Sequence, residues 1–155
     1  PVRCVVLDAS ITVASCVGEH EAAELSDAVL EMLHAGVAVV PSAWLGEVAN
    51  VFVSKERTGR REHKLTAEEA SAFLEFVGRL PVVVDWTTQE IVFGTVAELA
   101  RSSGLTVYDA LYLELAKRLG APLASLDAQL CAAATRLGIE VVTKESLDAW
   151  RGEGT

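Results

Sequence analysis

Short apolar runs alternate with longer helical patterns along the whole chain, and this alternation restricts the possible folds more than any other feature. Continuous runs of Val, Leu and Ala bounded by turn residues are typical of strands that are buried on both faces. Strands that alternate with helices form a parallel sheet covered by helices. We therefore expect an α/β fold with helices on both faces of a mainly parallel sheet. The five expected strands are 3–8, 37–40, 82–84, 122–125 and 140–142.

Residues that favour helix ends separate these strands from the helical patterns. Hydroxyl and acidic residues precede the patterns, and glycines follow several of them. The expected helices span about 21–35, 43–54, 66–77, 88–103, 107–119 and 128–137. The chain of 155 residues has the size of one domain, and no linker divides it. We expect one domain over residues 1–145 and a tail over residues 146–155.

Charge and composition narrow the classes of function. The formal net charge of −9 repels nucleic acid at long range, so a nucleic-acid substrate would have to be held locally. Cys4, Cys16 and Cys131 are isolated in apolar surroundings, which predicts reduced core residues rather than a disulfide or zinc framework. No apolar run approaches the roughly 20 residues of a membrane span. We expect a cytoplasmic protein without membrane contact. The hydrophobic share of 51 % favours an interface with another chain.

An acidic residue follows directly on the first apolar run, where Cys4-Val5-Val6-Leu7 ends in Asp8. In an open parallel sheet, ligands bind beyond the carboxyl ends of the strands. Asp8 would lie at that edge, as would Asp127, which follows the fourth expected strand. Glu47 belongs to a narrow polar stripe on an otherwise apolar helix, and Asp109 lies in the first turn of a later helix. The sequence therefore predicts that these acids meet at one edge of the sheet.

Each of these acids also has a purely structural explanation. Asp109 and Asp127 suit the start of a helix, and Glu47 suits the solvent face of a half-buried helix. Their combination is harder to explain in this way, because no Lys or Arg adjoins any of them in sequence. Two carboxylates repel by about 4 kcal/mol at roughly 4 Å. A hard divalent cation with a preference for oxygen ligands, Mg²⁺ or Mn²⁺, would offset that repulsion.

Other chemistries of such a sheet edge fit poorly. The chain contains neither G-x-x-x-x-G-K-[ST] nor a G-x-G-x-x-G after the first strand, so the common nucleotide cradles are excluded. Phosphotransferases of the haloacid dehalogenase type need a second Asp two residues after the first, where this chain has Ser10. His20, His34 and His63 lack metal-ligand spacing.

Four motifs in order resemble a PIN domain, and specifically a bacterial toxin of the VapC type. They are "VVLDAS" at 5–10, "WLGEVANVF" at 44–52, "LTVYDALYLELAKRLGAPLASLD" at 105–127 and "GIEVV" at 138–142. The resemblance implies a five-stranded parallel sheet and a ribonuclease dependent on Mg²⁺ or Mn²⁺. It implies that the catalytic and metal-binding acids are Asp8, Glu47, Asp109 and Asp127. The side chains expected to orient ligands or water are Ser125, Asn50 and Ser10.

The resemblance also implies partners. Toxins of this type form homodimers and are silenced by a cognate antitoxin protein, which inserts a peptide into the active-site groove. Cleavage of RNA would leave a 5′-phosphate and a 3′-hydroxyl.

The stretch 55–64 holds five of the thirteen basic residues and is either a solvated connector or a local phosphate-contacting patch. The RNA-binding candidates are therefore Lys55, Arg57, Arg60, Arg61 and Lys64. Two alternatives stay open: a catalytically silent interaction module with a PIN fold, and a DNA nuclease of related fold.

Overall fold

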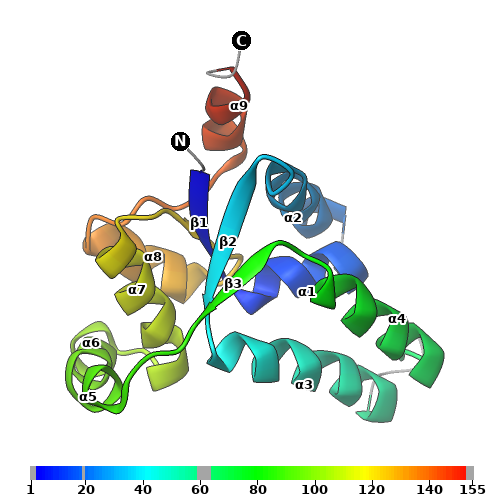
Figure 1. The fold of residues 1–155 in the computed structure, drawn as a ribbon, viewed down its shortest axis with the longest axis horizontal. Coiled ribbons are helices and arrows are strands. Elements are labelled where there is room, and N and C mark those ends of the chain that lie inside the picture. The colour runs from blue at the N-terminus through cyan, green and yellow to red at the C-terminus, as the bar shows by residue number, and fades with distance from the viewer. Residues whose placement is uncertain (1–2, 19, 59–63, 153–155) are drawn as a thin grey trace.

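The computed structural model describes residues 3–18, 20–58 and 64–152 and contains one parallel sheet. Its four strands lie in the order β3-β2-β1-β4 (Figure 1). Val6 of β1 pairs with Val39 of β2 on one side and with Leu123 of β4 on the other. The strands are β1 (Arg3–Leu7), β2 (Gly36–Pro41), β3 (Val82–Asp85) and β4 (Leu123–Ala124). The predicted α/β fold with a parallel sheet is thereby confirmed.

The predicted fifth strand over residues 140–142 is wrong for the described chain. Val141 makes only an isolated parallel bridge to Leu123, supported by a hydrogen bond from Val142 N to Leu123 O of 2.9 Å. A longer ladder cannot form, because β4 offers only two residues and Thr143 caps the next helix by exchanging hydrogen bonds with Ser146. The sheet therefore has four strands and one bridge at its β4 edge.

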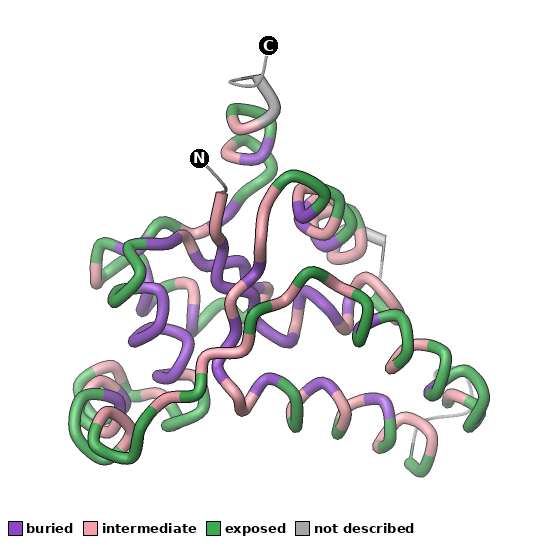
Figure 2. Tube along the Cα trace, viewed as in Figure 1, coloured by how far each residue is buried: buried purple, intermediate pink, exposed green. Residues whose placement is uncertain are grey.

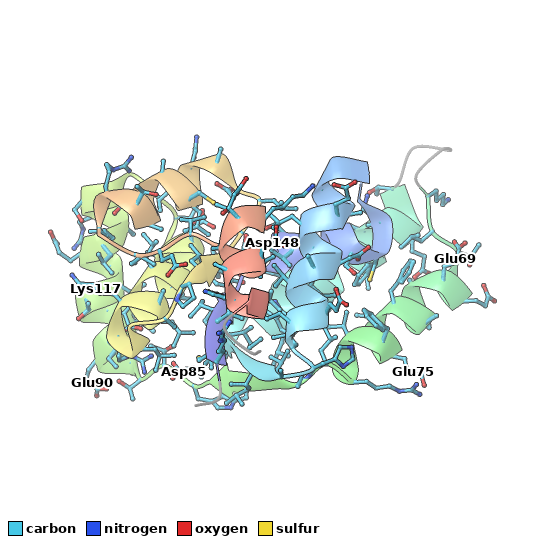
Figure 3. The ribbon with its side chains drawn as sticks, turned by 90° about the horizontal axis from the view of Figure 1, so that it is seen from above. Glu69, Glu75, Asp85, Glu90, Lys117 and Asp148 are labelled. Carbon is cyan, nitrogen blue, oxygen red and sulfur yellow. The ribbon has the colours of Figure 1, made fainter. Side chains whose placement is uncertain are left out.

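Helices cover both faces of this sheet. Figures 1 and 3 show α7 and α8 on one side, and α1 and α2 on the other. The helical elements in chain order are α1 (Ala9–Val17), α2 (His20–Met32), α3 (Ala43–Thr58), α4 (Ala67–Gly78), α5 (Gln89–Ile91), the π-helix η1 (Val92–Val96), α6 (Ala97–Ser103), α7 (Val107–Leu119), α8 (Ala128–Arg136) and α9 (Lys144–Gly152). No helix of the described residues is long and apolar enough to cross a membrane.

Two helices were not expected from the sequence. In α1, polar side chains are few and follow no helical period, and the helix is enclosed by α2 and α3, so the apolar stripe that marks a surface helix is missing. The other is α9, which begins at Lys144, packs on α2 and buries Leu147. The domain boundary placed after residue 145 stays a prediction.

The expected helix over 88–103 is divided in the structure. A π-helical turn over Val92–Val96 separates α5 from α6, and Gly94 stands at its centre. Glycine has low helix propensity and tolerates such local widening. The segment stays helical, but because of the π-helical turn the residues of α6 face other directions than they would in one continuous α-helix.

The core lies between the sheet and its helices. Figure 2 shows buried stretches along β1, which Asp8 follows, and along α7, which carries Asp109 in its first turn. Residues 110–116 of α7 are all buried, and α7 packs on β1 and β2. Gly120 ends this helix at φ +60°, a left-handed conformation that favours glycine. The candidate site is therefore built on rigid elements.

Candidate active site

Asp8 follows β1 and stands at the N-cap position of α1. It is only 6 % exposed, and its backbone N–H donates to Ala124 O of β4 at 2.9 Å. Its carboxylate makes no capping hydrogen bond to α1. The side chain is therefore available for contacts across the sheet edge, even though the position is one that aspartate often fills as a cap.

Two serine hydroxyls hold the same oxygen of this carboxylate. Ser10 Oγ donates to Asp8 Oδ2 at 2.6 Å, and Ser125 Oγ donates to it at 2.7 Å. Both hydroxyls also accept backbone hydrogen bonds of 3.0 Å, from Leu126 N and Asp127 N respectively. Asp8 Oδ1 has no hydrogen-bond partner among the described residues. The network fixes the carboxylate and leaves one oxygen for a ligand.

Glu47 is brought to Asp8 by helix α3 and is held by Tyr112 of α7. Tyr112 is fully buried, and its hydroxyl donates to Glu47 Oε1 at 3.2 Å. Burial raises the pKa of Glu47, the hydrogen bond from Tyr112 lowers it, and the negative charges of Asp8 and Asp109 raise it further. Burial also raises the pKa of Tyr112, so its hydroxyl stays protonated as a donor.

Asp109 lies in the first turn of α7, where its backbone N–H donates to the Thr106 cap at 3.1 Å. Burial raises the pKa of Asp109, the Thr106 hydroxyl lowers it, and Asp127 and Asp8 raise it. Asp127 is exposed and caps α8, accepting a 2.9 Å hydrogen bond from Leu130 N through Oδ1. Asp127 therefore combines the structural role of a cap with a place among the acids.

The four predicted acids line one hollow of about 280 Å³. The described residues around it are Asp8, Ala9, Ser10, Val13, Glu47, Val51, Asp109 and Asp127. They include no Lys, Arg or His, so the charge of the carboxylates is not balanced by a side chain of the hollow. The sequence prediction that these acids meet at one edge agrees with their positions, while their catalytic and metal-binding roles stay predictions.

The donor set fits a hard divalent cation in its chemistry. Carboxylate oxygens are the ligands that Mg²⁺ and Mn²⁺ prefer. The pKa values of Glu47 and Asp109 are raised first by burial and then by the negative charges of neighbouring acids, which a bound cation would offset. Within the described part of the chain, however, no group of three or more His, Cys, Asp or Glu side chains is arranged so that it could hold a metal ion. Some rearrangement of these side chains is required for binding.

The remaining predicted residues are distributed differently. Asn50 is exposed and lines a neighbouring hollow that also contains Glu47, rather than the acidic one. Lys55 and Arg57 lie in the last turn of α3, and Lys64 is exposed before α4. Two further basic candidates lie outside the described residues, namely Arg60 and Arg61.

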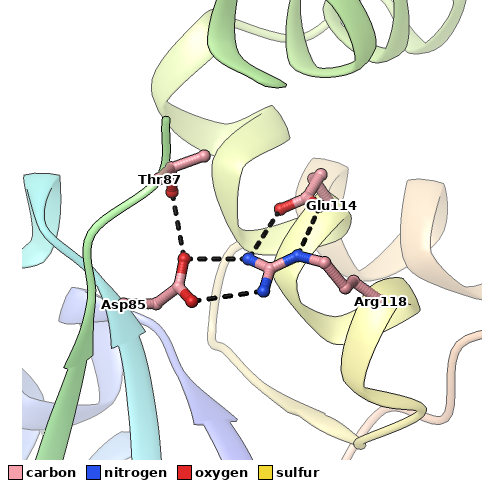
Figure 4. Close-up of polar contacts among 4 residues, drawn as sticks. All are labelled: Asp85, Thr87, Glu114 and Arg118. Atoms are coloured by element: carbon pink, nitrogen blue, oxygen red, sulfur yellow. Dashed lines mark hydrogen bonds and ion pairs between the residues drawn. The ribbon is translucent and has the colours of Figure 1, made fainter. Parts of the chain in front are cut away.

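Two contacts of this region were missed from sequence. Tyr112 follows Asp109 by three residues, so its place on the same helix face could have been inferred. The second is an ion-pair network (Figure 4), in which Arg118 binds Asp85 Oδ2 at 2.8 Å and Glu114 Oε1 at 2.7 Å. Thr87 also donates to Asp85 at 3.1 Å. The spacing of Glu114 and Arg118 indicates a helical pair, but nothing in the sequence points to Asp85.

Comparison with known proteins agrees with the fold. The model of the PIN domain family matches residues 5–136. PAE2754 from Pyrobaculum aerophilum has a similar structure, with a TM-score of 0.58, 22 % identity, and coverage of 85 % of this chain and 86 % of that one. FitAcB from Neisseria gonorrhoeae is also similar, with a TM-score of 0.57, 13 % identity, and coverage of 90 % of this chain and 96 % of that one. These two likenesses concern the fold. No curated protein matches the sequence.

PIN domains are generally nucleases that use divalent metal ions. The family match covers the last part of β1, Asp8 directly after it, and the helix that Asp127 caps. The chain belongs to the PIN domain family.

Proposed function

We propose that the protein is a metal-dependent endoribonuclease and the toxin of a VapC-type toxin–antitoxin pair. The observation that carries the proposal is the gathering of Asp8, Glu47, Asp109 and Asp127 around one hollow, without a basic side chain among its described lining residues. Membership of the PIN family supports nuclease chemistry. The four VapC-like motifs support the assignment to RNA and to a toxin–antitoxin pair.

The chain's own residues divide the work of such a site. Asp8, Glu47 and Asp109, with Asp127, would hold Mg²⁺ or Mn²⁺ through carboxylate oxygens. A bound ion of this kind lowers the pKa of a water molecule and stabilises charge on a phosphate. Ser10 and Ser125 keep Asp8 Oδ2 occupied, so that Oδ1 stays directed to a ligand. Tyr112 restrains Glu47 in the same way through Oε1.

Partners follow from the same proposal. A cognate antitoxin would silence the toxin, and a homodimer would form the toxin unit in the cytoplasm. Exposed apolar side chains beside Glu47, namely Trp86 and Tyr108, supply surface for such contacts. Lys55 and Arg57 in the last turn of α3, together with Lys64 before α4, would meet phosphates of RNA.

The experiment is cleavage of unstructured RNA by the purified chain, freed from any partner, with Mg²⁺, with Mn²⁺ and with a chelator. The substitution Asp8→Asn should abolish cleavage and leave the metal-free fold as stable or more stable, because one repelling charge is removed. Asp148→Asn in α9 is the matched control and should cleave normally. Unfolding of Asp8→Asn would make Asp8 structural, and cleavage that survives the chelator would contradict the metal requirement.

A parallel assay with single-stranded DNA of the same sequence separates the alternatives. Cleavage of DNA but not RNA would identify a DNA nuclease. Absence of cleavage of both, with an intact metal-free fold and normal Mg²⁺ binding, would identify an interaction module instead.

A further inference from the structure

A second hollow of about 590 Å³ adjoins the acidic one and shares Glu47 with it. We name it the aromatic groove. Helix α3 contributes Gly46, Glu47 and Asn50 to it, Trp86 comes from the segment after β3, and Tyr108 comes from the first turn of α7. The aromatic groove and the acidic hollow share Glu47, and Tyr108 of the groove directly precedes Asp109 of the hollow. The two hollows therefore lie side by side.

The two aromatic side chains of the groove, Trp86 and Tyr108, are largely exposed to solvent. Trp86 is 73 % exposed and Tyr108 is 63 % exposed. Rings of this size are normally buried, and they concentrate at binding surfaces when they are not. The described lining residues of the aromatic groove include no Lys or Arg, and Glu47 contributes a negative charge. The aromatic groove therefore offers no positive charge to a phosphate. A flat uncharged ring, in contrast, can stack on Trp86 or Tyr108.

The backbone that presents Trp86 is fixed on both sides. Asp85 is held by Arg118 through hydrogen bonds of 2.8 and 3.2 Å, and Thr87 donates to the Asp85 carboxylate at 3.1 Å (Figure 4). Ser42 N also donates to Asp85 O at 3.1 Å. A platform held in this way loses little conformational freedom when a ligand stacks on it.

The polar edge of the aromatic groove is available for hydrogen bonding. The amide side chain of Asn50 and the hydroxyl of Ser42 line the groove, and neither side chain has a hydrogen-bond partner among the described residues. An amide and a hydroxyl both donate and accept, which suits the Watson–Crick edge of a base.

We propose that the aromatic groove binds one unpaired nucleobase of the RNA, next to the phosphate that is cleaved, with the base stacked on Trp86 or Tyr108. The inference rests on the proposed ribonuclease function. A paired base offers neither its face nor its edge, so the groove selects single-stranded segments and loops. Stacking also provides affinity that needs no positive surface, which matches a chain of net charge −9.

The test uses a ten-nucleotide unstructured RNA and a series in which one base at a time is removed, leaving the ribose and phosphate. Binding is measured with Ca²⁺ in place of Mg²⁺, and cleavage is measured with Mg²⁺. For the wild-type chain, one abasic position beside the cleaved bond should weaken binding by about tenfold, within the roughly 5- to 150-fold that one stacked base is worth.

The variants Trp86→Leu and Tyr108→Leu should weaken binding of the intact RNA and lose the sensitivity to that one abasic position. Phe93→Leu is the matched control, because Phe93 is also 73 % exposed and lies outside the groove. It should behave like the wild type. Trp86→Phe, which keeps a ring face, should retain most of the sensitivity.

The outcomes separate this inference from the proposed function. Cleavage of RNA with equal behaviour of the Trp86 and Phe93 variants overturns the groove and leaves the nuclease. Position-specific binding without cleavage of RNA supports the groove and overturns the nuclease. Trp86→Leu and Tyr108→Leu can also lose affinity equally for intact and abasic RNA and change the oligomeric state in sedimentation. That result would make the two aromatic residues an interface between copies of the chain and would overturn the proposal.

Discussion

Ser125 Oγ donates to Asp8 Oδ2 at 2.7 Å, and thereby joins two residues that are 117 positions apart in sequence. Asp8 follows β1 and Ser125 follows β4, its neighbour in the sheet, so the parallel pairing of Leu7 with Ala124 brings the two side chains to one edge. This hydrogen bond is buried, so removing one partner leaves the other with an unsatisfied polar atom and lowers the stability of the fold.

Replacing Ser125 by Ala should therefore destabilise the protein by about 1–3 kcal/mol. Asp8 Oδ2 keeps only the donor of Ser10, and Asp127 N loses its acceptor. The free energy of unfolding from urea titration measures the effect, and Ser102→Ala, which removes an exposed hydroxyl of α6, should change it by less than about 0.5 kcal/mol. Equal effects of both substitutions would contradict a special role of the Asp8 network.

Stability without metal should depend on pH through Glu47 and Asp109. Both pKa values are raised in the folded state, mainly by burial, so the folded chain holds protons that the unfolded chain releases. Their contribution to stability is present at low pH and is lost as pH rises from the unfolded pKa through the folded one. The free energy of unfolding is measured by urea titration in the presence of a chelator, from acid to neutral pH. As pH rises, it should fall less in Glu47→Gln and in Asp109→Asn than in the wild type. A loss identical to that of the wild type would remove these acids as its cause.

Tyr112→Phe should alter the pH dependence of Mg²⁺ activation while leaving the shape of the core unchanged. The hydroxyl of Tyr112 lowers the pKa of Glu47, so its removal should raise that pKa and move the midpoint of activation to higher pH. The midpoint is read from cleavage rates at fixed Mg²⁺. Tyr108→Phe loses an exposed hydroxyl and should leave the midpoint in place. An unmoved midpoint in Tyr112→Phe would show that the contact does not tune Glu47.

Arg118→Met should destabilise the fold by leaving Glu114, which is 6 % exposed, without its partner. The cost should be about 2 kcal/mol, below the roughly 3–5 kcal/mol of a fully buried pair, because the Arg118 side chain is 37 % exposed. Adding Glu114→Gln should recover part of the loss, since the buried charge is then gone. Thermal or urea unfolding of the single and double variants measures the coupling, and strict additivity would contradict it.

Gly46→Ala and Gly120→Ala should change stability in opposite directions. A Cβ at Gly46 would meet nothing within 4 Å, so the substitution should stabilise α3 by up to about 1 kcal/mol. Gly120 has φ +60°, where a Cβ is strained, so Ala there should destabilise the chain. Melting temperatures measure both, and Gly46→Leu should in addition weaken RNA binding by filling the aromatic groove.

Local sequence rules predicted the parts of the fold that depend on neighbouring residues. The apolar run before Asp8 predicted β1, and the Thr66–Glu69 capping box is present at the start of α4. The narrow polar stripe on its helix predicted Glu47 as a companion of Asp8, and the family resemblance then implied a shared role for the two acids.

The parts that depend on contacts between distant residues were not predictable in the same way. Whether Val141 extends the sheet depends on how many residues β4 offers as partners. Helix α1 lacks an apolar stripe because it is enclosed, and Asp85 gains its role only because α7 carries Arg118 past the end of β3. Periodicity and capping describe single elements, and these features arise between elements.

The shortness of β4 has a consequence for how the protein opens. β4 pairs with β1 at only two positions, Val6–Leu123 and Leu7–Ala124, and it leads directly to Ser125 and Asp127. Segments with so few ladder hydrogen bonds exchange their amide protons through low-energy local opening. The amides of Val6 and Asp8, which donate to Pro122 and Ala124, should therefore exchange faster than those that β1 shares with β2. Each such opening takes Asp127 and the Ser125 hydroxyl away from Asp8 while the pairing of β1 with β2 persists, so the protein can lose its acidic site and recover it without unfolding.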